Sequence, residues 1–241
     1  MKFGHVIFSS FVDFLFPISC VGCREKDVFL CPECFNSIKF IEIRECPYCR
    51  TPNKTGRKCL KCEGPIDALF VACKYEKDGV LKRVIESFKY KFNKEFETVL
   101  GSILYTQSQK LFNFFTQLPV SVADVSLVPV PLHQKRLNER GYNQSDLICC
   151  KFVSKSCTYT KRSQILIRQK NTPPQAKLNK SERFDNVKSA FKCVHPDLVK
   201  NKNFVLVDDV CTTLSTLNEC AIELKKNGAL KVCGLVLARG D

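Results

Sequence analysis

The segment VLVDDVCTTLSTL, residues 205–217, joins an apolar run to two adjacent carboxylates and then to a loop rich in hydroxyl groups. The apolar run belongs to a predicted strand at 203–210, and its continuous apolar character is typical of a strand buried on both faces of a parallel sheet. In such sheets ligands bind beyond the carboxyl ends of the strands. The sequence therefore places Asp208 and Asp209 where a ligand site is expected.

A helix is predicted at 216–227, directly after this loop. Thr216 and Glu219 have the spacing of a capping box at its start, and Gly228 is the expected stop at its end. The free N–H groups and the positive end of the helix then converge on the loop, which is a favourable arrangement for a phosphate group.

The side chains of the loop suit a sugar phosphate. Hydroxyl donors for a phosphate come from Thr212, Thr213, Ser215 and Thr216. Ionised carboxylates only accept hydrogen bonds, so Asp208 and Asp209 suit the two O–H groups of a diol. A diol beside a phosphate describes a ribose 5-phosphate. The alternative is that the aspartates begin a turn and the hydroxyl groups only cap a helix.

Strand-like and helix-like segments alternate through residues 67–241. The predicted strands are 67–76, 125–132, 164–169, 203–210 and 231–240. The predicted helices are 79–92, a second one that continues to about residue 116, 143–156, 180–187 and 216–227. Such alternation predicts an α/β fold, a mostly parallel sheet with helices on both faces.

Cysteines mark off the first part of the chain. Eight of the sixteen lie in four C-x-x-C pairs, at Cys20, Cys23, Cys31, Cys34, Cys46, Cys49, Cys59 and Cys62. Two such pairs complete the four-thiolate shell that zinc prefers, so four pairs predict two zinc ions. Sequential pairing is the simplest scheme, although crossed pairing also fits the spacing. The alternative is that the thiols are buried or form redox pairs.

The zinc sites are predicted to be structural, in a unit formed by residues 1–66. So short a segment with few large apolar side chains needs metal to fold. The remaining residues, 67–241, carry 28 Lys and Arg against 17 Asp and Glu. This second domain is therefore expected to attract phosphates or polyanions, unless the charge only serves solubility.

The start of the chain, residues 1–19, is apolar but is interrupted by Asp13 and Pro17. It is shorter than the ~20 apolar residues of a membrane span and lacks a small-residue cleavage site. We interpret it as an amphipathic helix that packs on the body of the protein, and we expect a cytoplasmic location. Sixteen cysteines without a signal peptide also argue against a disulfide scaffold.

Four ordered blocks resemble the ComF (ComFC) family of competence proteins over nearly the whole chain. They are the C-x-x-C pairs, PVPLHQKRLNERGYNQ (129–144), RQKNTPPQAKLNKSERFDNVKSAF (168–191) and the Asp-Asp loop. The loop itself resembles the motif T-T-G-x-T, preceded by two acidic residues, that binds phosphoribosyl pyrophosphate (PRPP) in type I phosphoribosyltransferases. The resemblance implies a phosphoribosyltransferase-like domain behind a small N-terminal double zinc ribbon.

The resemblance also implies roles for individual residues. Asp208 and Asp209 would hold the ribose, and the 5-phosphate would lie against Thr212, Thr213, Leu214, Ser215 and Thr216. The pyrophosphate, with Mg²⁺, would face Lys135, Arg136 and Arg140. Thr172, Gln175 and Arg183 match a mobile loop that closes over PRPP. These polar residues are also compatible with an ordinary solvated surface.

Leu214 departs from the family pattern, which has glycine at this position. Glycine adopts a positive φ without steric cost, whereas a leucine with positive φ stores about 1–3 kcal/mol of strain. Leu214 leaves the fold prediction intact but puts tight PRPP binding in doubt.

Three functions remain open from the sequence. The first is a PRPP-binding ComF-family protein that handles incoming single-stranded DNA during natural transformation, with a helicase-like competence protein as a partner. The second is an active phosphoribosyltransferase of unknown acceptor. The third is a zinc-stabilised DNA-binding adaptor whose PRPP site has decayed. We rank them in this order.

Overall fold

A computed structural model describes residues 18–90, 95–118, 124–156, 159–173 and 180–240. The predicted N-terminal helix lies outside these residues. Among the residues that the structure describes, no helix is long and apolar enough to cross a membrane.

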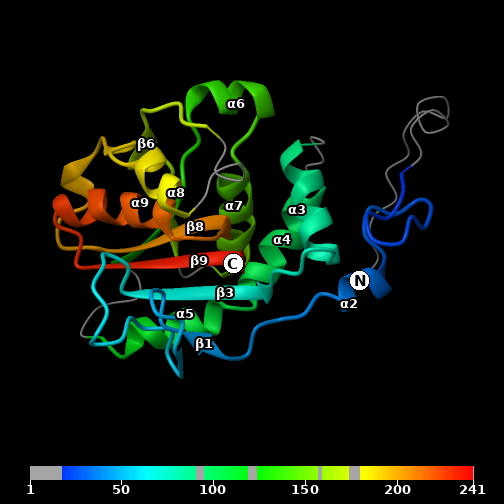
Figure 1. The fold of residues 1–241 in the computed structure, drawn as a ribbon, viewed down its shortest axis with the longest axis horizontal. Coiled ribbons are helices and arrows are strands. Elements are labelled where there is room, and N and C mark those ends of the chain that lie inside the picture. The colour runs from blue at the N-terminus through cyan, green and yellow to red at the C-terminus, as the bar shows by residue number, and fades with distance from the viewer. Residues whose placement is uncertain (1–17, 91–94, 119–123, 157–158, 174–179, 241) are drawn as a thin grey trace.

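A five-stranded parallel sheet forms the centre of the molecule (Figure 1). Its strands, in spatial order, are β3 (Ala68–Lys74), β9 (Lys231–Arg239), β8 (Asn203–Cys211), β4 (Val125–Pro129) and β5 (Thr160–Lys161). Every neighbouring pair in the sheet runs parallel. Seven consecutive residues of β9 are buried, as expected for a strand covered on both faces. The predicted α/β fold is confirmed.

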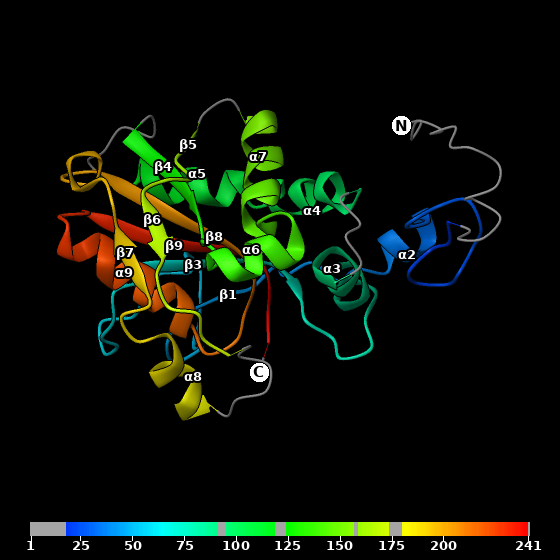
Figure 2. The same ribbon diagram turned by 90° about the horizontal axis from the view of Figure 1, so that it is seen from above.

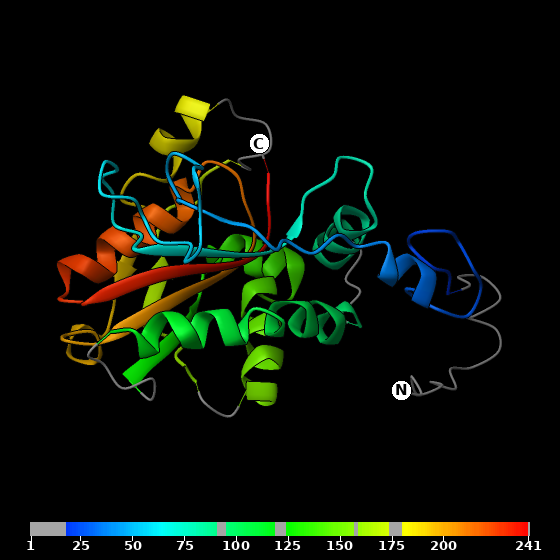
Figure 3. The ribbon, with the colours of Figure 1, turned by 90° about the horizontal axis from the view of Figure 1, so that it is seen from below.

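Helices cover one face of the sheet, and a helix with a small two-stranded sheet covers the other (Figures 2 and 3). The first face holds α3 (Val80–Tyr90), α4 (Phe96–Tyr105), α5 (Ser108–Thr116) and α7 (Gln144–Ser156). The second holds α9 (Ser215–Lys226) and the antiparallel pair β6 (Leu166–Arg168) and β7 (Phe191–Cys193). Alternation along β8 divides the two cores, because Val205 and Val207 face the first and Phe204 and Leu206 the second.

Shorter elements complete the described structure. They are α2 (Pro32–Asn36), β1 (Arg44–Glu45), β2 (Pro52–Asn53), α6 (Gln134–Arg140), α8 (Lys180–Val187) and a 3-10 turn at Pro196–Leu198. Several details differ from the prediction. The helix expected to continue to residue 116 is two helices, α4 and α5, and the short strands β5 and β7 and the helix α6 were not predicted. The strand predicted at 164–169 is β6, which pairs antiparallel with β7 outside the main sheet.

The predicted capping box is wrong. Helix α9 begins at Ser215, so Leu214 and not Thr216 occupies the capping position. The Glu219 carboxylate accepts a hydrogen bond from the Ser189 N–H at 2.7 Å instead of folding back on its own helix. A tertiary donor therefore competes successfully for the carboxylate that the local motif requires.

The cysteine-rich part of the chain covers the outer edge of β3. Residues 39–41 bond to one end of the strand, through Ile41 N–H to Ala72 O and Lys74 N–H to Lys39 O, both at 2.9 Å. Residues 56–58 bond to the other end, through Leu69 N–H to Gly56 O at 3.0 Å. These contacts satisfy backbone groups that an open sheet edge would expose.

The packing predicts how two phenylalanines on α5 differ in importance. Phe114 is 4% exposed and lies edge-on to Phe70 of β3 at 5.8 Å, whereas Phe112 is 38% exposed. We expect Phe114→Ala to lower the free energy of unfolding by about 3–5 kcal/mol, because it removes contacts and leaves a cavity.

The matched control, Phe112→Ala, should cost about 1 kcal/mol or less. Urea unfolding of both variants and the parent protein measures the difference. Equal losses would contradict the assignment of Phe114 to the core.

Candidate functional site

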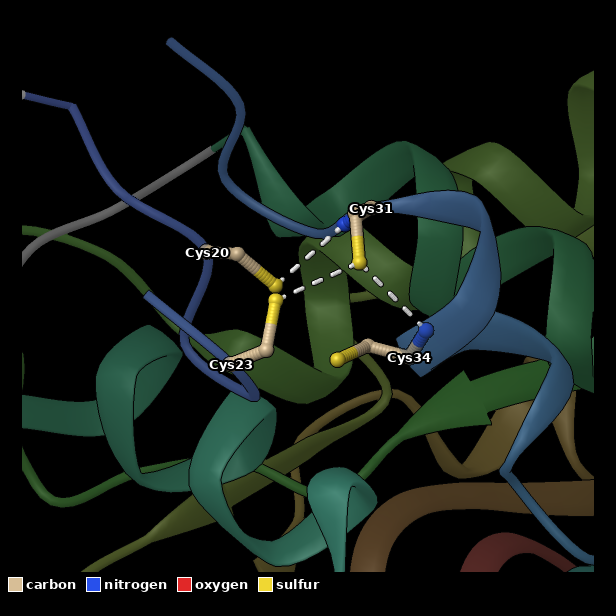
Figure 4. Close-up of side chains that lie close together, drawn as sticks. All are labelled: Cys20, Cys23, Cys31 and Cys34. Atoms are coloured by element: carbon tan, nitrogen blue, oxygen red, sulfur yellow. Dashed lines mark hydrogen bonds between the residues drawn. The ribbon is translucent and has the colours of Figure 1, made fainter. Parts of the chain in front are cut away.

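The first cysteine group forms at the end of the molecule nearest α2 and α3 (Figure 4). Cys20 and Cys23 come from a turn, Cys31 precedes α2, and Cys34 lies within it. Cys23 Sγ and Cys31 Sγ are 3.6 Å apart. Glycine at position 22 leaves room for the Cys34 side chain, because a Cβ at that position would lie 2.3 Å from Cys34 Sγ.

The second group lies around the hairpin of β1 and β2. It consists of Cys46, Cys49, Cys59 and Cys62, and the sulfurs of Cys49 and Cys59 are 3.7 Å apart. Tyr48 fixes this group against the sheet domain. Its hydroxyl donates to Asn218 Oδ1 on α9 at 3.1 Å and accepts from Ile66 N–H at 2.9 Å.

Both groups fit a four-thiolate zinc site. Within each group all the ligand atoms lie within 4.8 Å of one another. Four sulfurs in tetrahedral contact with zinc are about 3.8 Å apart, given the usual Zn–S distance. The structure therefore pairs the C-x-x-C units sequentially and not crosswise. The eight predicted cysteines would hold two zinc ions.

Each group already favours at least one thiolate. Burial would raise the pKa of Cys20, but backbone N–H donors from Cys23, Cys31 and Gly22 outweigh burial and lower it to about 6. At Cys49 the hydroxyl and backbone of Thr51 lower the pKa to about 6. Because the thiolate is the form that binds metal, these hydrogen bonds favour zinc loading at neutral pH.

The Asp-Asp pair lies at the carboxyl end of β8, as predicted, but its two side chains have different partners. Asp208 Oδ1 accepts hydrogen bonds from Ser145 Oγ on α7 at 2.9 Å and from Asp209 N–H at 3.0 Å. Asp209 is 6% exposed and forms an ion pair with Lys89 of α3 at 2.8 Å. Asp209 is thus already neutralised, while Asp208 has only neutral donors.

This arrangement changes the pKa values of Asp208 and Lys89. Burial, together with the charge of Asp209, raises the pKa of Asp208 to about 7, against the opposing effect of Lys89. Burial lowers the pKa of Lys89, but the charges of Asp209 and Asp208 outweigh burial and raise it. Asp208 is therefore expected to titrate near neutral pH.

Leu214 has φ +63°, the left-handed conformation in which glycine is favoured. Its side chain is nevertheless only 4% exposed and packs into the core under α9. Burial of a leucine contributes about 1.5–3 kcal/mol. This contribution is similar in size to the strain of about 1–3 kcal/mol expected for a non-glycine residue at positive φ.

A small hollow lies between the end of β8 and the start of α9. It is lined by Asp208, Val210, Cys211, Thr212, Leu214, Ser215, Thr216 and Leu217. Its volume of about 20 Å³ is room for one water molecule. Two of the residues predicted at this loop do not line the hollow. Asp209 is paired with Lys89, and the Thr213 hydroxyl lies 2.9 Å from that of Ser215.

The basic segment after β4 forms a short helix, α6. His133 caps it by accepting from Lys135 N–H at 3.1 Å, and Gly141 ends it with φ +68°. Arg136 donates to the backbone oxygen of Thr172, which brings two predicted segments together. Arg140 instead donates to Gln144 Oε1 and lies over the ring of Tyr90.

Three further residues at this site are not identified by any sequence pattern. Lys89 and Ser145 contact the aspartates from helices distant in the chain, and no local pattern identifies them. Arg168 donates to Thr172 Oγ1 at 2.6 Å, and its Nε is buried without a hydrogen-bond partner among the described residues. Gln175 and the side chain of predicted site residue Arg183 lie outside the described structure.

A parallel α/β domain joined to two four-cysteine groups defines a zinc-ribbon α/β protein. Comparisons agree with this class, since residues 11–63 match the double zinc ribbon domain family. Competence protein F of Haemophilus influenzae is 30% identical over 234 residues, which cover 92% of this chain and 98% of that protein.

Two further relatives have similar coverage. DNA utilization protein YhgH of Escherichia coli is 31% identical over 213 residues, covering 88% of this chain and 85% of the relative. Competence protein ComFC of Bacillus subtilis is 26% identical over 226 residues, covering 89% and 86%. The chain belongs to the ComF family of competence proteins.

Zinc content should follow the sequential grouping of the cysteines. We expect Cys31→Ser and Cys46→Ser each to bind one zinc ion per chain where the parent binds two, because each change removes a ligand from a different group. The control is Cys150→Ser, an exposed cysteine outside both groups, which should keep both ions. Elemental analysis of the purified proteins measures the ratio, and full zinc content in either ligand variant would contradict the grouping.

The raised pKa of Asp208 predicts a pH-dependent stability. Between the ordinary aspartate value and about 7, the folded protein retains a proton that the unfolded chain has lost, so the free energy of unfolding falls as pH rises. Asp208→Asn removes this loss. From pH 5.5 to pH 8 we expect the variant to gain about 2 kcal/mol relative to the parent in urea unfolding.

Asp124→Asn is the control, because Asp124 is exposed at the start of β4 and should show no such gain. A pH-independent difference between Asp208→Asn and the parent would contradict the raised pKa.

Proposed function

We propose that this protein binds PRPP at the loop between β8 and α9. The observation that carries the proposal is an Asp-Asp pair near the carboxyl end of a parallel strand, followed by a left-handed residue at the start of a helix. The backbone and hydroxyl groups of 212–216 would hold the 5-phosphate, and Asp208 would accept hydrogen bonds from the ribose diol. Asp209 would act through its ion pair with Lys89, which fixes the end of β8.

The pyrophosphate would face the basic residues of the neighbouring segments. Arg136 and Arg168 both donate hydrogen bonds to Thr172, so their two guanidinium groups lie close together. Burial, followed by the charge of Arg136, lowers the pKa of Arg168, which indicates that two cations are held close together. An anion there would stabilise both groups. Lys135, Arg140, Gln175 and Arg183 would complete this side, and Mg²⁺ would accompany PRPP.

The hollow at the loop is too small for a phosphate, since it has room for one water molecule. The proposal therefore requires the loop to move outward when PRPP binds. Leu214 opposes this motion, because its side chain is anchored in the core. This anchor is the specific observation that favours the alternative, a DNA-binding adaptor whose PRPP site no longer functions.

We further propose that the protein takes part in DNA uptake in the cytoplasm, as the names of the relatives suggest for those proteins. The formal net charge of +14 supports contact with single-stranded DNA, since phosphate neutralisation drives such binding. A helicase-like competence protein would be a partner. Phosphoribosyl transfer to an acceptor is a further possibility at the same site.

Calorimetric titration of Mg²⁺–PRPP into the zinc-loaded protein tests the proposal. We expect binding by the parent and at least about a tenfold loss in Asp208→Asn, because the amide offers one neutral acceptor oxygen in place of two charged ones. Binding by the parent should strengthen from pH 6 to pH 8 as Asp208 ionises. Asp124→Asn should bind like the parent.

Leu214→Gly separates the two candidate functions. If the parent fails to bind PRPP and Leu214→Gly binds it, the leucine blocks the loop and the adaptor function is favoured. If neither protein binds PRPP, the proposed PRPP site is refuted.

A further inference from the structure

A second cavity, of about 280 Å³, lies where the cysteine-rich part of the chain meets the sheet. Its walls come from the segment that leads into β1, from Arg50 beside the second four-cysteine group, and from β3 and β9. Arg239 of β9 pairs in register with Cys211, the last residue of β8. The cavity thus lies one strand away from the proposed PRPP loop and does not share its lining.

Positive charge predominates around this cavity. Four cationic side chains line it, namely Arg44, Arg50, Lys74 and Arg239. The lining also contains two carboxylates, Glu45 and Glu76, but Glu76 is paired with Lys39 at 2.7 Å. The lining therefore carries four cations against two carboxylates, which makes the cavity attractive to an anion.

Two arginines hold the walls of the cavity together. Arg239 Nη2 donates to Pro47 O at 2.6 Å, and Arg50 Nη2 donates to Gly240 O at 2.9 Å. This reciprocal pair fastens the second four-cysteine group to the end of β9. These bonds hold both guanidinium groups in fixed positions in the lining of the cavity.

Apolar side chains also line the cavity. They include Ile43 and Tyr75, and Ile43 is 68% exposed. A lining that combines apolar and guanidinium groups suits a ligand that has a flat ring at one end and an anion at the other. The volume is close to the lower end of the range for small-molecule sites.

We infer that this cavity is a nucleotide-binding site, in which the arginines and Lys74 hold the phosphate and the base lies against Ile43 and Tyr75. The site is independent of PRPP binding. A free mononucleotide and the phosphorylated 5′ end of a DNA strand have the same chemistry, and both are compatible with a cavity that opens at the edge of the sheet.

Calorimetric titration with thymidine 5′-monophosphate tests the site. We expect one bound nucleotide per chain, with an affinity at least about tenfold above that of thymidine or inorganic phosphate alone. Thymidine lacks the phosphate that the cations bind, and inorganic phosphate lacks the base that contacts the apolar side chains. Lys74→Gln and Ile43→Ala change exposed side chains that line the cavity, so they should fold normally and weaken binding about three- to tenfold. Arg239→Gln should weaken it more.

Arg83→Gln is the control, because it removes an exposed positive charge on α3 away from the cavity. Zinc content, measured in every variant, identifies any that has lost the four-cysteine groups. Asp208→Asn should bind the nucleotide like the parent, even if PRPP binding fails altogether. Nucleotide binding that is absent, unchanged in Lys74→Gln and Arg239→Gln, or equalled by inorganic phosphate would overturn the inference.

Oligothymidine with and without a 5′ phosphate distinguishes the two sources of the nucleotide. If the phosphorylated strand competes with thymidine 5′-monophosphate and the unphosphorylated strand does not, the site takes a strand end. If neither strand competes while the mononucleotide binds, the site takes a free nucleotide. Both results support the nucleotide site and differ only in its source.

Discussion

The burial of β8 between β9 and β4 is the constraint on which the rest of the structure depends. The strand pairs in parallel with both neighbours, and its side chains divide two hydrophobic cores. Because the apolar pattern ends at Asp208, the strand can be buried up to that residue and no further without charge compensation. Lys89 supplies this compensation from α3. The position of the Asp-Asp pair near the carboxyl end of β8 is therefore fixed by where the apolar run stops.

Leu214 shows how a departure from a family pattern can be accommodated. Its backbone keeps the left-handed conformation that glycine would adopt, so the turn from β8 into α9 is unchanged. Its side chain fills space beneath α9, and the gain from burial offsets the strain. The conformation that places N–H groups at the helix start is thus preserved, whereas the freedom of the loop to move is reduced.

The four-cysteine groups also have a role in the sheet. Residues 39–41, between the two groups, and residues 56–58, within the second group, lie along the outer edge of β3. Tyr48, Arg50 and Arg239 fasten the second group to α9 and β9. Zinc binding would therefore stabilise a strand edge as well as the cysteine loops themselves. The same junction creates the cavity for which we infer a nucleotide.

The sequence by itself determined the α/β class, the eight metal-ligand cysteines and the position of Asp208 and Asp209, because each of these depends on a local pattern of spacing or apolar character. The sequence could not identify Lys89, Ser145 and Arg168 as neighbours of the site, since they come from segments far apart in the chain. It also assigned Glu219 to a local cap, although a tertiary donor uses that carboxylate. Only the tertiary structure decided the sequential pairing of the cysteines, the different partners of Asp208 and Asp209, and the burial of Leu214. Each of these depends on which elements pack together.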